Sequence, residues 1–206
     1  MEDAVLMLVE DKGQKAKEHL IKNAWWSNNK IAVRRLPLPV GDYVIANNKI
    51  ADVVNRKVAR GIDVKKMDLI GTYDISVDTK KDIQEIVGNI CGKSHGRFRD
   101  ECILAQNNNI KLIVLVENRD GVEKIEDLFD WQNPRTERYE KLKRLKEQGK
   151  AKNQKLAKKP PTTGEQLAKS MLTMQEKYEV VFKFCTPENS GKEVIRLLMR
   201  KDKDNE

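Results

Sequence analysis

Two acidic residues and one lysine have the types and the order that metal-assisted phosphodiester hydrolysis requires. Asp42 lies in a Gly-Asp-Tyr turn, and Asp78 and Lys80 are separated by one threonine. Because residues i and i+2 share one face of a strand, Asp78 and Lys80 are expected to project side by side. Carboxylates are good ligands for Mg²⁺ or Mn²⁺, and such an ion polarises a phosphate and acidifies a bound water. A lysine beside them can orient that water or neutralise developing charge.

This pattern of acid, acid and lysine has a second interpretation. With 35% of the residues charged, such spacings also arise by chance. The same side chains would then form a local ion pair at an exposed strand end, which contributes little to stability. The surrounding elements must therefore support one interpretation or the other.

The elements around these residues are predicted from apolar periodicity. Residues 73–77 alternate between apolar and polar, which predicts a strand leading into Asp78. We predict further strands at 4–9, 31–36, 110–116 and 180–184, and helices at 15–26, 82–90, 97–106, 162–175 and 190–199. The 162–175 helix is expected to begin with a capping box formed by residues 162–165. Residues 47–72 carry no assignable pattern, and the alternation of strands with helices predicts an α/β fold.

Positive charge is concentrated in one segment. Residues 133–160 hold eleven basic and three acidic side chains, a net charge of +8, while the rest of the chain is neutral. Clustered lysine and arginine gain affinity for nucleic acid by releasing phosphate counterions, so the segment indicates a polyanion partner. The alternative is a solvated surface helix followed by a loop, with the charge serving only solubility.

Composition excludes several classes of protein. A length of 206 residues suits one domain with its own core. Three cysteines without C-x-x-C spacing and two histidines do not suggest a zinc site, and we expect reduced thiols. The acidic start and the short apolar run at 4–9 predict neither a signal peptide nor a membrane span. We therefore expect a cytoplasmic protein with no membrane partner.

Three motifs in order resemble the XPF-type nuclease domain of the restriction-endonuclease-like PD-(D/E)XK group. They are Leu38-Pro39-Val40-Gly41-Asp42-Tyr43, then Val77-Asp78-Thr79-Lys80, then Glu85-Ile86-Val87-Gly88-Asn89-Ile90. The resemblance covers roughly residues 4–199 and implies a single nuclease domain over 1–199 with a charged tail at 200–206. It implies a restriction-endonuclease-like core in which helices flank a central mixed sheet. It also implies a DNA endonuclease that uses Mg²⁺ or Mn²⁺ and prefers branched or flap DNA.

The resemblance assigns roles residue by residue. Asp42, Asp78 and Lys80 would be catalytic, with Asp42 and Asp78 as metal ligands and Glu10 and Glu85 as further candidate ligands. The candidate DNA contacts are Arg97, Arg56, Lys57, Arg138, Lys141 and Arg144. A homodimer sharing the apolar Leu167/Met171 side of a late helix is also implied, as is a bacterial or phage origin.

The chain departs from the family pattern at several points. The family's E-R-K is here Asp78-Thr79-Lys80, and an early glutamate is replaced by Gly13, for which Glu10 or Asp11 could substitute. An insertion at about 47–72 contains a rival motif, Asn55-Arg56-Lys57, but asparagine is a weaker Mg²⁺ ligand than a carboxylate. We also expect no helix-hairpin-helix module of the kind that follows the nuclease domain in the family. A catalytically inactive DNA-binding or scaffolding module and an RNA-binding or RNA-cleaving protein therefore remain open alternatives.

Overall fold

The computed structural model describes residues 6–15, 19–151 and 153–199. Its strands are β1 (Met7–Asp11), β2 (Ala32–Leu36), β3 (Tyr43–Ile45), β4 (Ile75–Lys80), β5 (Lys111–Glu117) and β6 (Val181–Cys185). Its α-helices are α1 (Leu20–Asn28), α2 (Asn48–Val58), α3 (Ile83–Ile90), α4 (His95–Asn107), α5 (Pro134–Glu147), α6 (Gly164–Tyr178) and α7 (Ser190–Leu198). Two short 3-10 helices, η2 (Lys66–Leu69) and η3 (Ile125–Phe129), complete the described secondary structure.

The strands form one mixed sheet in the order β2-β1-β3-β4-β5-β6. β1 pairs parallel to β2, and β4, β5 and β6 are mutually parallel, whereas β3 runs antiparallel to β1 and β4. The predicted α/β class with a central mixed sheet flanked by helices is confirmed. Because β4 and β5 are parallel, their carboxyl ends lie at the same edge of the sheet.

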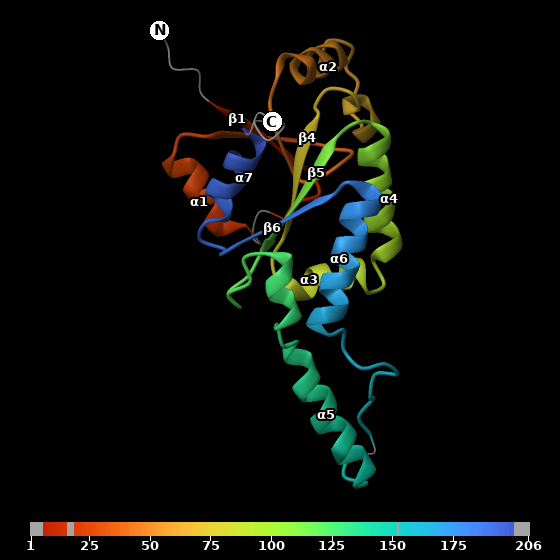
Figure 1. The fold of residues 1–206 in the computed structure, drawn as a ribbon. Helices are drawn as coiled ribbons and strands as arrows, with labels where there is room; N and C mark the ends of the chain where they lie inside the picture. Colours follow the sequence, from red (N-terminus) through yellow and green to blue (C-terminus); the bar gives the residue numbers. More distant parts are fainter. Residues whose placement is uncertain (1–5, 16–18, 152, 200–206) are drawn as a thin grey trace.

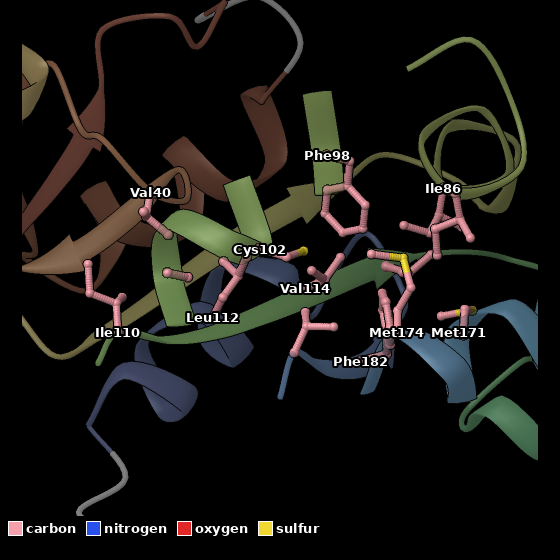
Figure 2. Packing of buried hydrophobic residues seen from close by; sticks show 14 of the residues in the cluster. Val40, Ile86, Phe98, Cys102, Ile110, Leu112, Val114, Met171, Met174 and Phe182 are labelled. Carbon is pink, nitrogen blue, oxygen red and sulfur yellow. The ribbon is translucent and has the colours of Figure 1, made fainter. Parts of the chain in front are cut away.

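The two faces of the sheet pack against different helices, as Figure 1 shows for α1 and α7 on one side and α4 and α6 on the other. β5 illustrates the alternation, since Leu112 and Val114 belong to the cluster with α3, α4 and α6, whereas Ile113 and Leu115 face α1 and α7. Figure 2 shows the first cluster, in which these two β5 side chains meet aromatic, thiol and thioether groups, including Phe98, Cys102, Met171 and Met174. Each face therefore has its own core.

The predicted helices and strands are largely present, with shifted ends. The capping box of α6 forms one residue later than predicted, since Thr163 Oγ1 accepts from Gln166 N at 3.2 Å and Gln166 Oε1 accepts from Thr163 N at 3.0 Å. Gly164 is the first residue of the helix, and glycine is required there because an added Cβ would lie 2.1 Å from the Leu128 oxygen. Parts of the predicted 4–9 strand and 15–26 helix lie outside the described residues.

Three further findings differ from or extend the sequence analysis. The unassigned segment 47–72 forms α2 and η2, and β3 begins at Tyr43, where a strand is expected to start after the Gly-Asp-Tyr turn. Leu167 and Met171 are fully buried against the chain's own core, so the side of α6 suggested for dimerisation is not exposed to a second copy. No helix among the described residues is long and apolar enough to cross a membrane.

Residues 134–151 and 153–161, called here the basic arm, project away from the sheet (Figure 1). α5 contains no buried residue. Its base is closed by Asn133, whose Nδ2 donates to Thr162 O at 2.7 Å and whose Oδ1 accepts from Gln84 Nε2 at 2.8 Å. The arm follows β5 through η3, so it leaves the core from the edge where the β4 and β5 strands end.

Candidate active site

A cavity of about 450 Å³ brings the sequence-predicted residues together at the end of β4. Asp42, Asp78 and Lys80 all line it, although they come from a turn before β3 and from β4. The remaining ionisable residues in its wall are Asp11, His19, Lys66, Lys81, Glu85, Arg97 and Glu101. The cavity is therefore a polar, charged opening rather than an apolar ligand pocket.

β4 places Asp78 and Lys80 side by side, as its alternation predicts. Lys80 Nζ lies 2.5 Å from Asp78 Oδ2, and both residues are buried, at 6% and 4% exposure. Lys80 Nζ also lies 5.6 Å from the centroid of the Phe98 ring. Asp78 Oδ2 is thus held by the Lys80 ammonium. A carboxylate can accept more than one such partner, so Asp78 can also contact a further positive charge.

The turn before β3 fixes Asp42 beside this pair. Gly41 has a positive φ of 70°, and a Cβ there would lie 1.9 Å from Ser76 Oγ, so glycine is required for the close approach of the turn to β4. Asp42 Oδ2 accepts from Thr79 N at 2.8 Å and from Thr79 Oγ1 at 3.1 Å, and Asp42 Oδ1 accepts from Gln14 Nε2. The carboxylate therefore has a fixed orientation at the cavity.

Glu101 is a further acid of this site that the sequence analysis did not identify. Its Oε1 accepts from Gly41 N at 2.9 Å, so it holds the same turn from α4. The signal lies in α4, where Phe98, Cys102 and Ala105 are buried and position 101 falls on the same helical stripe. A charged residue at a position expected to be apolar was the available sequence cue.

The charged groups in the cavity shift one another's pKa values. Burial, and then the negative charge of Asp78, raise the pKa of Asp42 well above its ordinary value, and the same two causes raise the pKa of Glu101. Burial opposes the charged form of Lys80, but the carboxylates of Asp78 and Asp42 outweigh it and the pKa of Lys80 is raised. The lysine is therefore an ammonium donor, and the acids gain from any added positive charge.

The acids fit a hard divalent ion, with most of its ligands supplied from elsewhere. Among the described residues, no three carboxylate, imidazole or thiol groups are arranged as a ready set of ligands. Mg²⁺ however commonly uses one or two carboxylates and completes its shell with water and substrate phosphate. Asp78 and Asp42, two carboxylates close enough for their charges to interact at the cavity, match that requirement.

The two remaining candidate ligands lie differently. Glu85 lines the cavity from the first turn of α3, where its Oε2 accepts from Lys81 N at 2.9 Å. Glu10 is not brought to the cavity: it pairs with Arg35 Nε at 3.1 Å and accepts from Tyr43 on the α1 and α7 side of the sheet. Its neighbour Asp11 points to the opposite face and lines the cavity instead.

The candidate DNA contacts form three separate groups. Arg97 lines the cavity from the start of α4. Arg56 and Lys57 lie on α2 beside a different hollow, where Lys57 Nζ pairs with Asp68 Oδ2 at 2.9 Å. The other three, Arg138, Lys141 and Arg144, are exposed on α5 in the basic arm.

Comparison with known proteins adds two similar solved structures. No family model matches the chain, and no curated protein matches it. XPF from Aeropyrum pernix in complex with DNA is similar with a TM-score of 0.49 and 14% identity, over 94% of this chain and 63% of that one. A second structure of XPF from Aeropyrum pernix has a TM-score of 0.49 and 12% identity, over 95% of this chain and 62% of that one. The chain thus spans less than two thirds of these proteins, and similarity of this degree assigns no activity to it.

Proposed function

We propose that this protein is a Mg²⁺- or Mn²⁺-dependent endonuclease that hydrolyses DNA phosphodiester bonds. The observation that carries the proposal is the convergence of Asp42, Asp78 and Lys80 in one cavity. A turn and a strand that are separated in sequence meet there, and the ion pair of Asp78 with Lys80 is buried, at 4% and 6% exposure. An ion pair at an exposed strand end would show neither feature.

Asp42 and Asp78 would hold the divalent ion, which when bound polarises the scissile phosphate and acidifies a water. The Thr79 and Gln14 donors keep the Asp42 carboxylate oriented before substrate arrives. Lys80 stays protonated because of its acidic neighbours, so its ammonium orients the attacking water or neutralises charge on the phosphate oxygens. Lys80 does not act as a base in this scheme.

DNA would be held by positive charge around and beyond the cavity. Arg97, Lys66 and Lys81 in the cavity wall are suited to the phosphates next to the scissile bond. The basic arm extends from the same edge of the sheet and would bind backbone phosphates further along the DNA. Selectivity for branched or flap DNA is part of the proposal and rests on the sequence resemblance.

The test is cleavage of end-labelled flap, splayed-arm and linear duplex DNA with Mg²⁺, Mn²⁺ or EDTA. The wild type should cut only with metal, and Asp42→Asn and Lys80→Met should each abolish cutting. Lys183→Met is a matched control, because Lys183 is also a strand lysine but is exposed on β6, away from the cavity. If every substrate survives but is still bound, the nuclease proposal fails and an inactive DNA-binding module becomes the better explanation. Equal cutting of all three substrates would refute the branch selectivity alone.

A further inference from the structure

A buried polar chain lies on the α1 and α7 face of the sheet, on the other side from Asp78 and Lys80. Its centre is Lys22 of α1, which is only 3% exposed. Lys22 Nζ donates to Glu117 Oε1 at 2.7 Å and to Thr79 Oγ1 at 3.1 Å. Ser190 Oγ at the start of α7 also donates to Glu117 Oε1, at 2.7 Å. α1, α7, β4 and β5 are therefore joined by one hydrogen-bonded chain.

The direction of hydrogen bonding is fixed by the chemistry of the groups. An ammonium donates only, and a threonine hydroxyl has a single proton to donate. Because Thr79 Oγ1 accepts from Lys22, its proton is directed to Asp42 Oδ2, which lies 3.1 Å away. The chain thus runs from Glu117 through Lys22 and Thr79 to Asp42.

Strand alternation makes Thr79 the connection between the two faces. Asp78 and Lys80 project into the cavity, and Thr79 between them borders the cavity while its hydroxyl meets Lys22 of the α1 and α7 face. On the adjacent strand Ile113 and Leu115 face the same way, and Glu117 continues that series. Lys22 reaches Asp42 through the Thr79 hydroxyl, since the hydrogen bonds of its ammonium go to Thr79 and Glu117.

The pair of Lys22 and Glu117 is not accounted for by stability alone. Buried ion pairs are often no more stabilising than well-packed apolar side chains of similar volume. Lys22 could also be satisfied by Glu117 and water if it lay nearer the surface. What its burial adds is a fixed donor to the hydroxyl that contacts Asp42.

We propose that Lys22 and Thr79 are positioning residues that orient the Asp42 carboxylate for metal binding. This inference rests on the proposed nuclease function. Groups that orient metal ligands typically change metal affinity or activity by about 10- to 100-fold when they are removed. Neither residue contacts the reacting phosphate in this scheme, so their loss should act through Asp42 alone.

The test measures Mn²⁺ binding by titration calorimetry without DNA, and kcat and KM on the best-cut substrate. Thr79→Val keeps the shape of the side chain but loses the hydroxyl, and is expected to weaken Mn²⁺ binding by about 10- to 100-fold and to lower kcat. Thr79→Ser restores the hydroxyl and should recover most of the affinity. Lys22→Met with Glu117→Gln removes the cation without stranding a buried charge, and should match the loss in Thr79→Val.

The decisive comparison combines these changes. If Lys22 acts through Thr79, adding Lys22→Met and Glu117→Gln to Thr79→Val should cause no further loss of Mn²⁺ affinity. Both sets of changes interrupt the same hydrogen-bonded chain to Asp42. Trp26→Phe is the control, since it removes a buried hydrogen bond to Gly191 O at 3.0 Å from the same α1–α7 interface and should leave Mn²⁺ affinity unchanged. Thermal melting of each variant identifies any that do not fold. If the Lys22 variant does not fold, the difference in Mn²⁺ affinity between Thr79→Val and Thr79→Ser decides the test.

Two kinds of failure are distinguishable. A wild type that cuts DNA and binds Mn²⁺, with Thr79→Val unchanged or with additive losses in the combined variant, overturns the inference and leaves the nuclease proposal standing. A folded wild type that neither binds Mn²⁺ nor cuts any substrate overturns the proposed function and this inference together.

Discussion

The basic arm allows a test of DNA binding that leaves the core untouched. Arg138, Lys141 and Arg144 are exposed on α5, and no residue of that helix is buried. Changing all three to glutamine removes three positive charges while keeping good helix formers in place. The fold and the cavity should therefore be unaffected, which equal thermal melting of variant and wild type would show.

The size of the effect follows from counterion release. Each lost phosphate contact reduces the slope of log affinity against log salt by about 0.9 for duplex DNA, so three contacts reduce it by about 2.7. Between 50 and 200 mM salt, the affinity of the wild type should then fall about 40-fold more than that of the variant. A smaller change would mean that fewer than three of these side chains contact phosphate.

Fluorescence anisotropy of a labelled duplex in EDTA, with salt varied over that range, measures this slope without cleavage. The control changes three exposed lysines on the α1 and α7 side, Lys30, Lys183 and Lys192, to glutamine. It removes the same charge and should keep the wild-type slope. If the control loses as much slope as the arm variant, net charge rather than the arm binds DNA, and the reasoning from the arm's position is wrong.

Three further predictions concern the core and the cavity. Glu101→Gln keeps an acceptor for Gly41 N but removes a half-buried negative charge, and burial and then Asp78 raise the pKa of Glu101. Near neutral pH the variant should stabilise the metal-free protein by about 0.5–2 kcal/mol and weaken Mn²⁺ binding. Thermal melting with and without Mn²⁺ measures both effects. A lower melting temperature of the metal-free variant would contradict the repulsion between Glu101 and Asp78. At pH 8 a thiol reagent should modify the exposed Cys91 quickly. Burial raises the pKa of Cys102 and of Cys185 to about 12, so these two thiols should react only when the protein unfolds. Equal reaction rates for all three thiols would contradict this. Leu167→Ala should lower the free energy of unfolding in urea by about 2–5 kcal/mol, because Leu167 is fully buried and its loss opens a cavity; a change below about 1 kcal/mol would mean that the site collapses.

Local periodicity in the sequence predicted much of the secondary structure of this protein and the face on which its side chains lie. The alternation before Asp78 predicted that Asp78 and Lys80 share a face, and their charged groups lie 2.5 Å apart. The apolar run of β5 and the stripes of α3, α4 and α6 were likewise readable, because each depends only on residues a few positions apart. The charge of the basic arm is also a property of the sequence.

Only the tertiary structure determined which distant segments of the chain lie next to each other on the sheet. β3 has three residues, too few to show a period, yet its antiparallel pairing of Tyr43 with Val77 brings the Asp42 turn to β4. The sequence left Glu10 and Asp11 as alternatives, and the order of the strands decides that only Asp11 faces the cavity. Alternation tells which residues share a face, but not which face a distant segment will cover.

The same limit explains the two groups that sequence reasoning missed. Glu101 reaches Gly41 across 60 positions, and Lys22 reaches Glu117 across 95, so no local pattern connects them. Their partners are chosen by helix packing on opposite faces of the sheet, where burial makes an unpaired charge costly and so fixes each contact. The sequence by itself determined the acids and the lysine on β4; only the folded sheet determined what surrounds and orients them.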